Sequence, residues 1–155
     1  MTDIITAYTG KVTLLAKKNN KIFRIPKKNI GTNILFKNII NFLCGNLKSK
    51  DVSAYKINQM QVVDNAGSAL SSPIIAITSI ISDNQILCES VLYRDNLIGT
   101  GTGLSSIYLS LRNAQNEVLA KVDLSAEIAS LYASEYDEIL IKWEMLFNNK
   151  EEVTK

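Results

Sequence analysis

The 155-residue chain contains no histidine, the side chain that most often serves as a general base and as a zinc ligand. Its absence excludes the Ser–His–Asp and Cys–His arrangements of nucleophilic catalysis, and nearly all zinc sites. The chain has only two cysteines, Cys44 and Cys88, which are too few for a disulfide framework. We interpret both as buried thiols of a protein made in a reducing cytoplasm.

Long apolar runs are also missing. No run of 18 apolar residues occurs, so we expect no membrane-spanning helix. The first residues, MTDIITAYTG, lack the basic start and apolar stretch of a signal peptide. Apolar residues still make up 46% of the chain, enough for a single core at this length. We expect one β-rich domain over residues 1–147 and a frayed tail over residues 148–155.

Charge is unevenly distributed along the chain. Residues 1–60 hold eleven Lys and Arg against two acids, a balance of +9, and residues 61–155 hold six against thirteen, a balance of −7. The two balances add up to the net charge of +2. The split can indicate an acidic partner for the basic half, nucleic acid included, or self-assembly of basic on acidic surfaces. It is equally compatible with charges that intermix and stay solvated within one folded domain.

The densest basic cluster lies near the N-terminus and is our candidate contact with a partner. It could meet phosphates, but Phe23 is the only aromatic residue nearby, so a stacking platform for single strands is weakly supported. A solvated hairpin tip explains the cluster as well. Its members are Lys17, Lys18, Lys21, Arg24, Lys27 and Lys28.

The first sixty residues predict a hairpin followed by a helix. Residues 9–16 and 22–25 alternate between apolar and polar side chains around the turn KKNNK, which indicates two strands. We expect Pro26 to end the second strand, because it lacks a donor. An apolar stripe at helical spacing then predicts an amphipathic helix over residues 32–44, with Thr32 as N-cap and Gly45 as its stop. The helix is apolar over more than half its circumference, so we expect it to lie between a sheet and a second covering element.

The rest of the chain follows a period of two. We expect strands at residues 55–63, 74–81, 86–93, 104–113, 118–124 and 138–147. SDNQ is expected to be a four-residue hairpin loop, and residues 125–137 fit either a short helix or a covered loop. Strands and helices do not alternate, which argues against a parallel sheet. The pattern therefore predicts a mainly β protein, an antiparallel β-sandwich with an N-terminal hairpin and one helix.

No residue pattern points to catalysis, and we expect no catalytic residue, cofactor or metal site. The glycines of GTGTG, residues 99–103, precede a strand pattern and not a helix, so they do not form a phosphate loop. Asp137 and Glu138 are sequence neighbours, which places them on opposite faces of a strand. Carbohydrate or small-ligand binding at loops has little support, since only Tyr93 and Tyr108 lie near expected loop ends.

The last predicted strand, EILIKWEMLFNN, carries the only tryptophan of the chain. Ile139, Ile141 and Trp143 share one face with Met145 and Phe147, whereas Leu140 and Leu146 share the opposite face with Lys142 and Glu144. A buried Trp removes on the order of 200 Å² from water, so we expect Trp143 to anchor the core. The two leucines on the other face suggest a partial cover, such as another subunit.

The order of these parts resembles small virion proteins of tailed bacteriophages. In both, a short hairpin (YTGKVTLLAKKNNKIFRI) leads to a helix that ends in Gly (NIGTNILFKNIINFLCGNL). A strand, polar turn and return strand (IYLSLRNAQNEVLAKVDLS) and a closing strand (EILIKWEMLF) follow. The resemblance covers most of residues 8–148 by order and spacing.

This resemblance implies a non-enzymatic structural component of the virion, of tail, baseplate, collar or head-fibre type, assembled in the bacterial host cytoplasm. It also implies contacts with other virion proteins and a homo-oligomer, most simply a trimer. The alternative is a nucleic-acid-binding accessory protein that uses the basic N-terminal hairpin.

Overall fold

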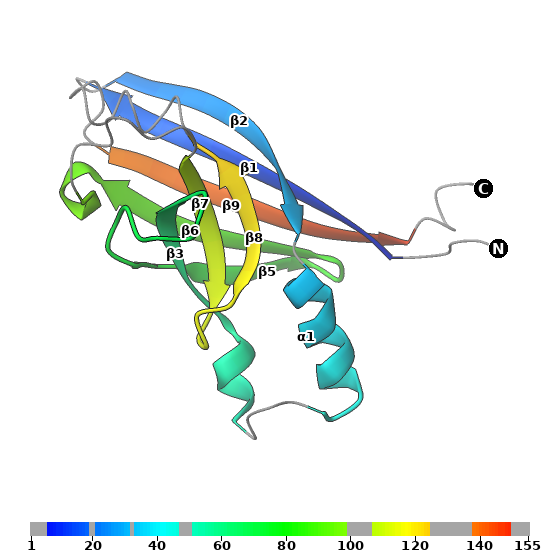
Figure 1. Ribbon diagram of the computed structural model, residues 1–155. Helices are drawn as coiled ribbons and strands as arrows, with labels where there is room; N and C mark the ends of the chain where they lie inside the picture. Colours follow the sequence, from blue (N-terminus) through cyan, green and yellow to red (C-terminus); the bar gives the residue numbers. More distant parts are fainter. Residues whose placement is uncertain are drawn as a thin grey trace.

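The structure is a computed structural model that describes residues 6–18, 21–31, 33–46, 51–98, 107–124 and 138–149. Within them the protein is mainly β, with nine strands and one α-helix (Figure 1). Every pair of neighbouring strands is antiparallel, and the strands form two layers around a shared core. The predicted antiparallel sandwich with one helix is confirmed.

The nine strands have one hydrogen-bonded order, β4-β3-β7-β8-β2-β1-β9-β6-β5, which passes from one layer to the other at the short β8–β2 pairing. We call β2-β1-β9-β6-β5 the first sheet and β4-β3-β7-β8 the second. The strands of the first are β2 (Lys21–Gly31), β1 (Thr6–Lys18), β9 (Glu138–Asn149), β6 (Gln85–Tyr93) and β5 (Ile77–Ser82). Those of the second are β4 (Ile74–Ile75), β3 (Ile57–Asp64), β7 (Ile107–Asn113) and β8 (Val118–Asp123).

The two sheets are linked at both margins. At one margin the end of β2 leaves its own layer, and Ile30 and Gly31 pair with β8. At the other, β4 runs directly through Ala76 into β5. There the Ser90 hydroxyl of β6 donates a 2.8 Å hydrogen bond to the Ile75 carbonyl. The layers therefore enclose the core on two sides as well as above and below.

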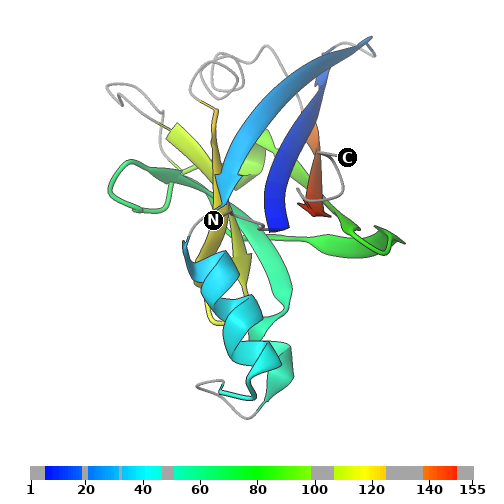
Figure 2. The ribbon, with the colours of Figure 1, turned by 90° about the vertical axis from the view of Figure 1, so that its right-hand side faces the viewer.

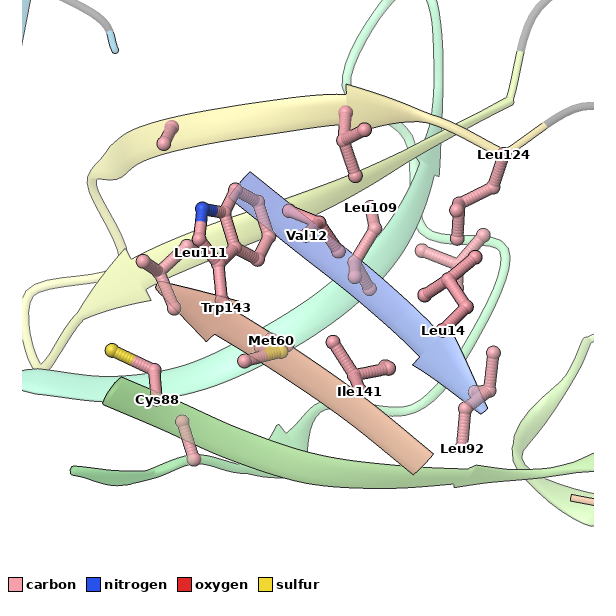
Figure 3. Packing of buried hydrophobic residues seen from close by; sticks show 14 of the residues in the cluster. Val12, Leu14, Met60, Cys88, Leu92, Leu109, Leu111, Leu124, Ile141 and Trp143 are labelled. Atoms are coloured by element: carbon pink, nitrogen blue, oxygen red, sulfur yellow. The ribbon is translucent and has the colours of Figure 1, made fainter. Parts of the chain in front are cut away.

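The core follows from the period-two pattern of the strands. Val12 of β1 and Cys88 of β6 lie on either side of Trp143 of β9, and all three are fully buried. Leu14 and Ile141 form the next row of the same face. Figure 3 shows Trp143 pointing from β9 into the space between the layers. The facing layer contributes Met60, Val62, Leu109, Leu111, Leu119 and Val122.

The predicted helix is present as α1 (Asn33–Leu43). Its stop is also as predicted, because Gly45 has a φ of 67°, which glycine adopts without steric cost. The Asn46 amide then donates a 2.8 Å hydrogen bond to the Asn41 carbonyl, as at a glycine-terminated helix end. Thr32, the predicted N-cap, lies outside the described residues.

The prediction that Pro26 ends the second strand is wrong. β2 continues to Gly31, and Pro26 lies opposite Thr13 of β1. Along this stretch β1 is the only strand beside β2 within the described residues, because β8 pairs only with Ile30 and Gly31. Such an edge can accommodate a proline, because only one side of the strand is paired with a neighbour.

The predicted strand over residues 74–81 is also divided. Ala76 separates β4 from β5, and the two halves lie at opposite ends of the strand order. The hairpin after it is tighter than expected, because Ser82 and Gln85 already pair and leave Asp83 and Asn84 as the turn. Both differences depend on where the chain passes from one layer to the other. The alternation of apolar and polar residues within a short segment does not predict that position.

Other strand boundaries differ from the predicted ones by a few residues. β3 begins at Ile57, after a 3₁₀ turn, η1 (Val52–Tyr55). β9 extends to Asn149, so the first two residues of the predicted tail are paired strand. The cysteine interpretation is half right, because Cys88 is buried but Cys44 is exposed. The predicted GTGTG loop and residues 125–137 lie outside the described part of the chain.

The central position of Trp143 predicts a large loss of stability on truncation. Trp143→Ala is expected to lower the free energy of unfolding by roughly 3–5 kcal/mol in chemical denaturation. Trp143→Phe should cost less, because the phenyl ring fills most of the space. The indole Nε1 has no hydrogen-bond partner among the described residues. Trp143→Phe therefore also removes an unpaired buried donor, which costs the folded state about 1–3 kcal/mol.

Thermal melting provides the check on this prediction. An alanine variant that melts within about two degrees of the parent would have lost less than ~1 kcal/mol. That outcome would contradict the role of Trp143 as the core anchor.

Candidate interaction surface

Helix α1 has its apolar side largely in solvent. Leu35 is buried, whereas Ile40 is 59% exposed and Leu43 is 77% exposed. The polar Asn38 is half-buried, and its Nδ2 atom is buried with no partner among the described residues. Solvent usually faces the polar side of such a helix, so this arrangement leaves an apolar surface uncovered. The predicted second covering element is not found in the described part of the chain.

A cluster of aromatic rings holds α1 against the first sheet. The Phe36 ring meets the Tyr8 ring edge-to-face, with 6.3 Å between their centroids. Tyr8 also contacts Phe147 of β9, with 5.5 Å between the centroids. Since Tyr8 and Phe147 are paired across β1 and β9, the helix is attached to the pair of strands at the centre of the sheet. Figure 2 shows α1 extending from the body of the sandwich.

A groove of about 840 Å³ lies between α1 and the β5–β6 hairpin. Its lining includes Met145 and Leu119, two buried residues of the core, so the groove lies directly against the core. One wall is α1, through residues such as Ile39 and Phe42. The other wall includes Ile80 of β5. The groove is therefore predominantly apolar.

Strand β5 and the preceding β4 form a second exposed apolar region. Ile77 is 66% exposed and Ile80 is 84% exposed, although both belong to a strand. Ile75 and Ile81 are exposed as well. We call α1 with its groove the helix surface, and Ile75–Ser82 the edge surface.

Only Lys17 and Lys27 of the predicted basic cluster have described side chains, and neither lines the groove. Lys17 is exposed and its Nζ atom lies 3.8 Å from a carboxylate oxygen of Glu138 on β9. Lys27 is half-buried and does not line the groove. The side chains of Lys18, Lys21, Arg24 and Lys28 lie outside the part that the structure describes.

A largely buried polar cluster surrounds Arg112 on β7. Its Nε donates to the Ser110 hydroxyl at 2.9 Å and its Nη1 donates to the Asn116 side-chain oxygen at 3.0 Å. Burial lowers the pKa of the Arg112 guanidinium. Asn116 has a φ of 65° in the β7–β8 turn, so the cluster stabilises a left-handed turn residue. These contacts link β7 to the β7–β8 turn.

The described residues contain no group of three or more Cys, Asp and Glu side chains placed to hold a metal ion. They also contain no helix of the length and hydropathy needed to cross a membrane.

The two tyrosines near predicted loop ends are Tyr93 and Tyr108. Tyr93 is exposed at the end of β6, and Tyr108 of β7 lies under the ammonium of Lys121, 4.9 Å from the ring centroid. Neither tyrosine lines the groove.

Comparisons with known proteins return no similarity. No protein-family model, curated protein or solved structure matches this chain. The two exposed apolar surfaces are therefore the features on which a function can be argued.

The sequence analysis did not predict the edge surface. It predicted the helix and its wide apolar stripe, but not that this stripe would be exposed. The width of the apolar stripe on α1 was a signal that one neighbouring layer would not cover it. For β5 the signal was weaker, because an apolar run such as IIAITSII fits a buried strand equally well.

Burial of Cys88 predicts a dependence of stability on pH. Desolvation raises the pKa of the Cys88 thiol from 9.0 to about 12. The unfolded chain therefore releases this proton first, and stability should fall as the pH rises from about 9 toward about 12. The loss should approach roughly 1.4 kcal/mol per pH unit within that window and be absent below it.

A Cys88→Ala variant isolates this contribution from other groups that titrate at high pH. The difference in unfolding free energy between parent and variant should shrink between about pH 8 and about pH 10. A constant difference would mean that the thiol ionises in the folded protein as readily as in the unfolded one.

Proposed function

We propose that this chain is a non-enzymatic structural component of a tailed-phage virion and acts through protein–protein contacts. Its role would be to attach a fibre, to form part of the tail, baseplate or collar, or to decorate the capsid. The observation that carries the proposal is the helix surface, an exposed apolar helix face beside a predominantly apolar groove.

The size of the helix surface supports a protein partner. With on the order of 200 Å² for a fully exposed side chain of this size, the exposed fractions on α1 leave roughly 500 Å² of apolar area. That is near the upper end for the largest apolar patch of a soluble monomer, about 300–600 Å², and such patches are often functional. The edge surface adds about as much again. Covering both would involve an area comparable to the ~800 Å² that one partner contributes to a standard interface.

The attachment of α1 supports the same proposal. The helix is fixed by aromatic contacts to β1 and β9, so its apolar face is held in place before any partner arrives. A preformed surface avoids the entropy cost of ordering a segment on binding. This is the property expected of a subunit that packs against neighbours in a particle.

The virion context comes from the resemblance in the order of parts. The chain has the hairpin, the glycine-terminated helix and the closing strand on which that resemblance rests. The resemblance also implies repeated copies, most simply a trimer, and contacts with other virion proteins. Portal, capsid or tail genes beside the gene for this chain would support the class directly, and their absence would count against it.

Nucleic-acid binding by the basic hairpin is the second candidate, favoured by the balance of +9 over residues 1–60. The ion pair between Lys17 and Glu138 weakens it, because an acidic group already lies beside the basic strand. The only described helix, α1, carries a single charged residue, Lys37, so it offers no basic face to a groove of DNA.

Replacing Ile40 and Leu43 with Glu tests the helix surface. Both side chains are exposed, so the unfolding free energy should change by no more than ~0.5 kcal/mol per site. Incorporation into particles should be strongly reduced, because two carboxylates would have to be desolvated in the contact. Particle-associated protein would be quantified after expression of each variant in place of the parent.

Ile98→Glu is the matched control, since Ile98 is 54% exposed and lies on neither α1 nor β5. The control should incorporate like the parent. If the α1 variant also incorporates normally, the helix surface is not a contact in the particle.

A charge reversal separates the two candidate functions. Replacing Lys17, Lys18 and Lys21 with Glu should leave the fold intact, because an exposed pair such as Lys17–Glu138 contributes about 0–1 kcal/mol. If the hairpin contacts an acidic virion protein, incorporation should fall because like charges then face each other. If it binds nucleic acid, affinity for any DNA should fall instead, and the parent's affinity should drop steeply with salt.

Both properties would be measured on the same variant, with DNA binding at two salt concentrations. We expect the loss in incorporation and no DNA binding by the parent. Salt-sensitive DNA binding by the parent that the triple variant loses would favour the second candidate.

A further inference from the structure

Strand β5 is an edge strand with apolar side chains on both of its faces. It lies at one end of the strand order, with β6 as its only neighbouring strand among the described residues. Ile80 is on the face that lines the groove, and Ile77, three residues earlier, is on the other face. All six residues of the strand are exposed. The strand thus presents an open edge and apolar side chains together.

Soluble proteins usually protect such an edge. Charged side chains, proline, or a covering loop or helix prevent pairing with another chain. The sequence of β5, ITSIIS, contains neither a charge nor a proline. A register shift between Ile80 and Ser82 is the one irregularity along it. The rest of the strand is therefore suited to accept another strand.

We propose that β5 pairs antiparallel with β5 of a second copy of this chain, across a two-fold axis. The pairing would join the first sheets of two copies into one continuous sheet. The inference rests on the proposed function, in which the chain works as repeated copies, and it names the partner at this edge.

The composition of β5 favours its own copy as the partner. Because the strand has no charge, antiparallel self-pairing places no like charges opposite each other at any register. Ile, Thr and Ser side chains would face one another, and β-branched pairs of this kind stabilise a sheet. An identical strand also satisfies the requirement that both sides of a two-fold contact use the same surface.

The exposed side chains of β5 would gain neighbours in such a pair. Ile77, Ile80 and Ile81 are 66%, 84% and 53% exposed. In the extended sheet each would lie beside side chains of the second copy on the same face, as cross-strand neighbours do. The backbone hydrogen bonds of the new strand pair would add to these contacts.

A two-fold pair at β5 is compatible with a trimer built elsewhere. Self-pairing uses one surface twice and stops at two copies, whereas a contact between two different surfaces can close a ring. Ile80 and Ser82 of β5 line the groove through their side chains, whereas self-pairing uses the backbone edge that faces away from β6, so both contacts can exist in one particle.

The test is the mass of the purified protein by light scattering over a range of concentrations. Ile77→Lys with Ile81→Lys places two charges on the strand while leaving its backbone and the core unchanged. The variant should have half the mass of the parent at the same concentration. Ile98→Lys, the matched control, should keep the parent's mass, and circular dichroism should show that both variants are folded.

A second measurement locates the contact. In a Cys44→Ser background Cys88 is buried, so a single cysteine at Ser79 is the only accessible thiol among the described residues. A short bis-maleimide should link two copies through Ser79→Cys, and should not link copies that carry Asn65→Cys in the β3–β4 connection. Equal linking at both positions would overturn the proposal.

The remaining outcomes distinguish this inference from the proposed function. A parent that stays monomeric, or a lysine variant with the parent's mass, overturns pairing at β5 and leaves the virion role in place. A strand of another particle protein would then be the occupant of the edge. A chain that pairs through β5 but never enters particles retains this inference and overturns the proposed function.

Discussion

The pairing of β1 with β9 is the interaction on which the rest of the structure depends. Twelve residue pairs, from Thr6–Asn149 to Lys17–Glu138, run without a register shift and join the first and last strands of the described chain. β2 is built on the free edge of β1, β6 on that of β9, and the aromatic contacts of α1 are made to this pair. Because its partners are so far apart in sequence, closing the pair carries a large loop entropy. We therefore expect folding to be limited by this long-range contact.

This pairing also explains why the only tryptophan stands so near the end of the sequence. Trp143 lies at the middle of β9, between Val12 and Cys88, where the two layers of the sandwich face each other. Further along the same strand, Met145 is still buried and Phe147 is half-buried, and both line the groove. One strand thus supplies a central side chain of the core and part of the lining of the groove. Stability and exposed apolar area are consequently linked through β9.

The sequence predicted the helix and the strands better than it predicted which neighbours they have and which of their residues are buried. Alternation identified the inner face of β9, and the apolar stripe with Gly45 identified α1, because both signals are local. Pro26 and Ala76 were misjudged because their effect depends on which strand lies beside them. Cys44 was misjudged because it follows an apolar helix whose outer side has no cover in the described structure. Whether an apolar residue is buried is decided by the tertiary arrangement, and here two apolar segments remain outside the core.

The charge split between the two halves of the chain has a partial explanation within the first sheet. Lys17 is ion-paired with Glu138, and Lys11 lies opposite Glu144 on the same outer face. The basic N-terminal strand is therefore paired with an acidic C-terminal one, which lowers the positive potential available to a phosphate backbone. Exposed ion pairs contribute little to stability or binding. The exposed apolar side chains of α1 and β4–β5 amount to about 1,000 Å², and removing that area from water would lower the free energy of an assembly. Covering part of that area contributes more to association than the exposed ion pairs do. Assembly of this protein is accordingly expected to be driven by apolar burial, with charge affecting mainly the rate and orientation of encounter.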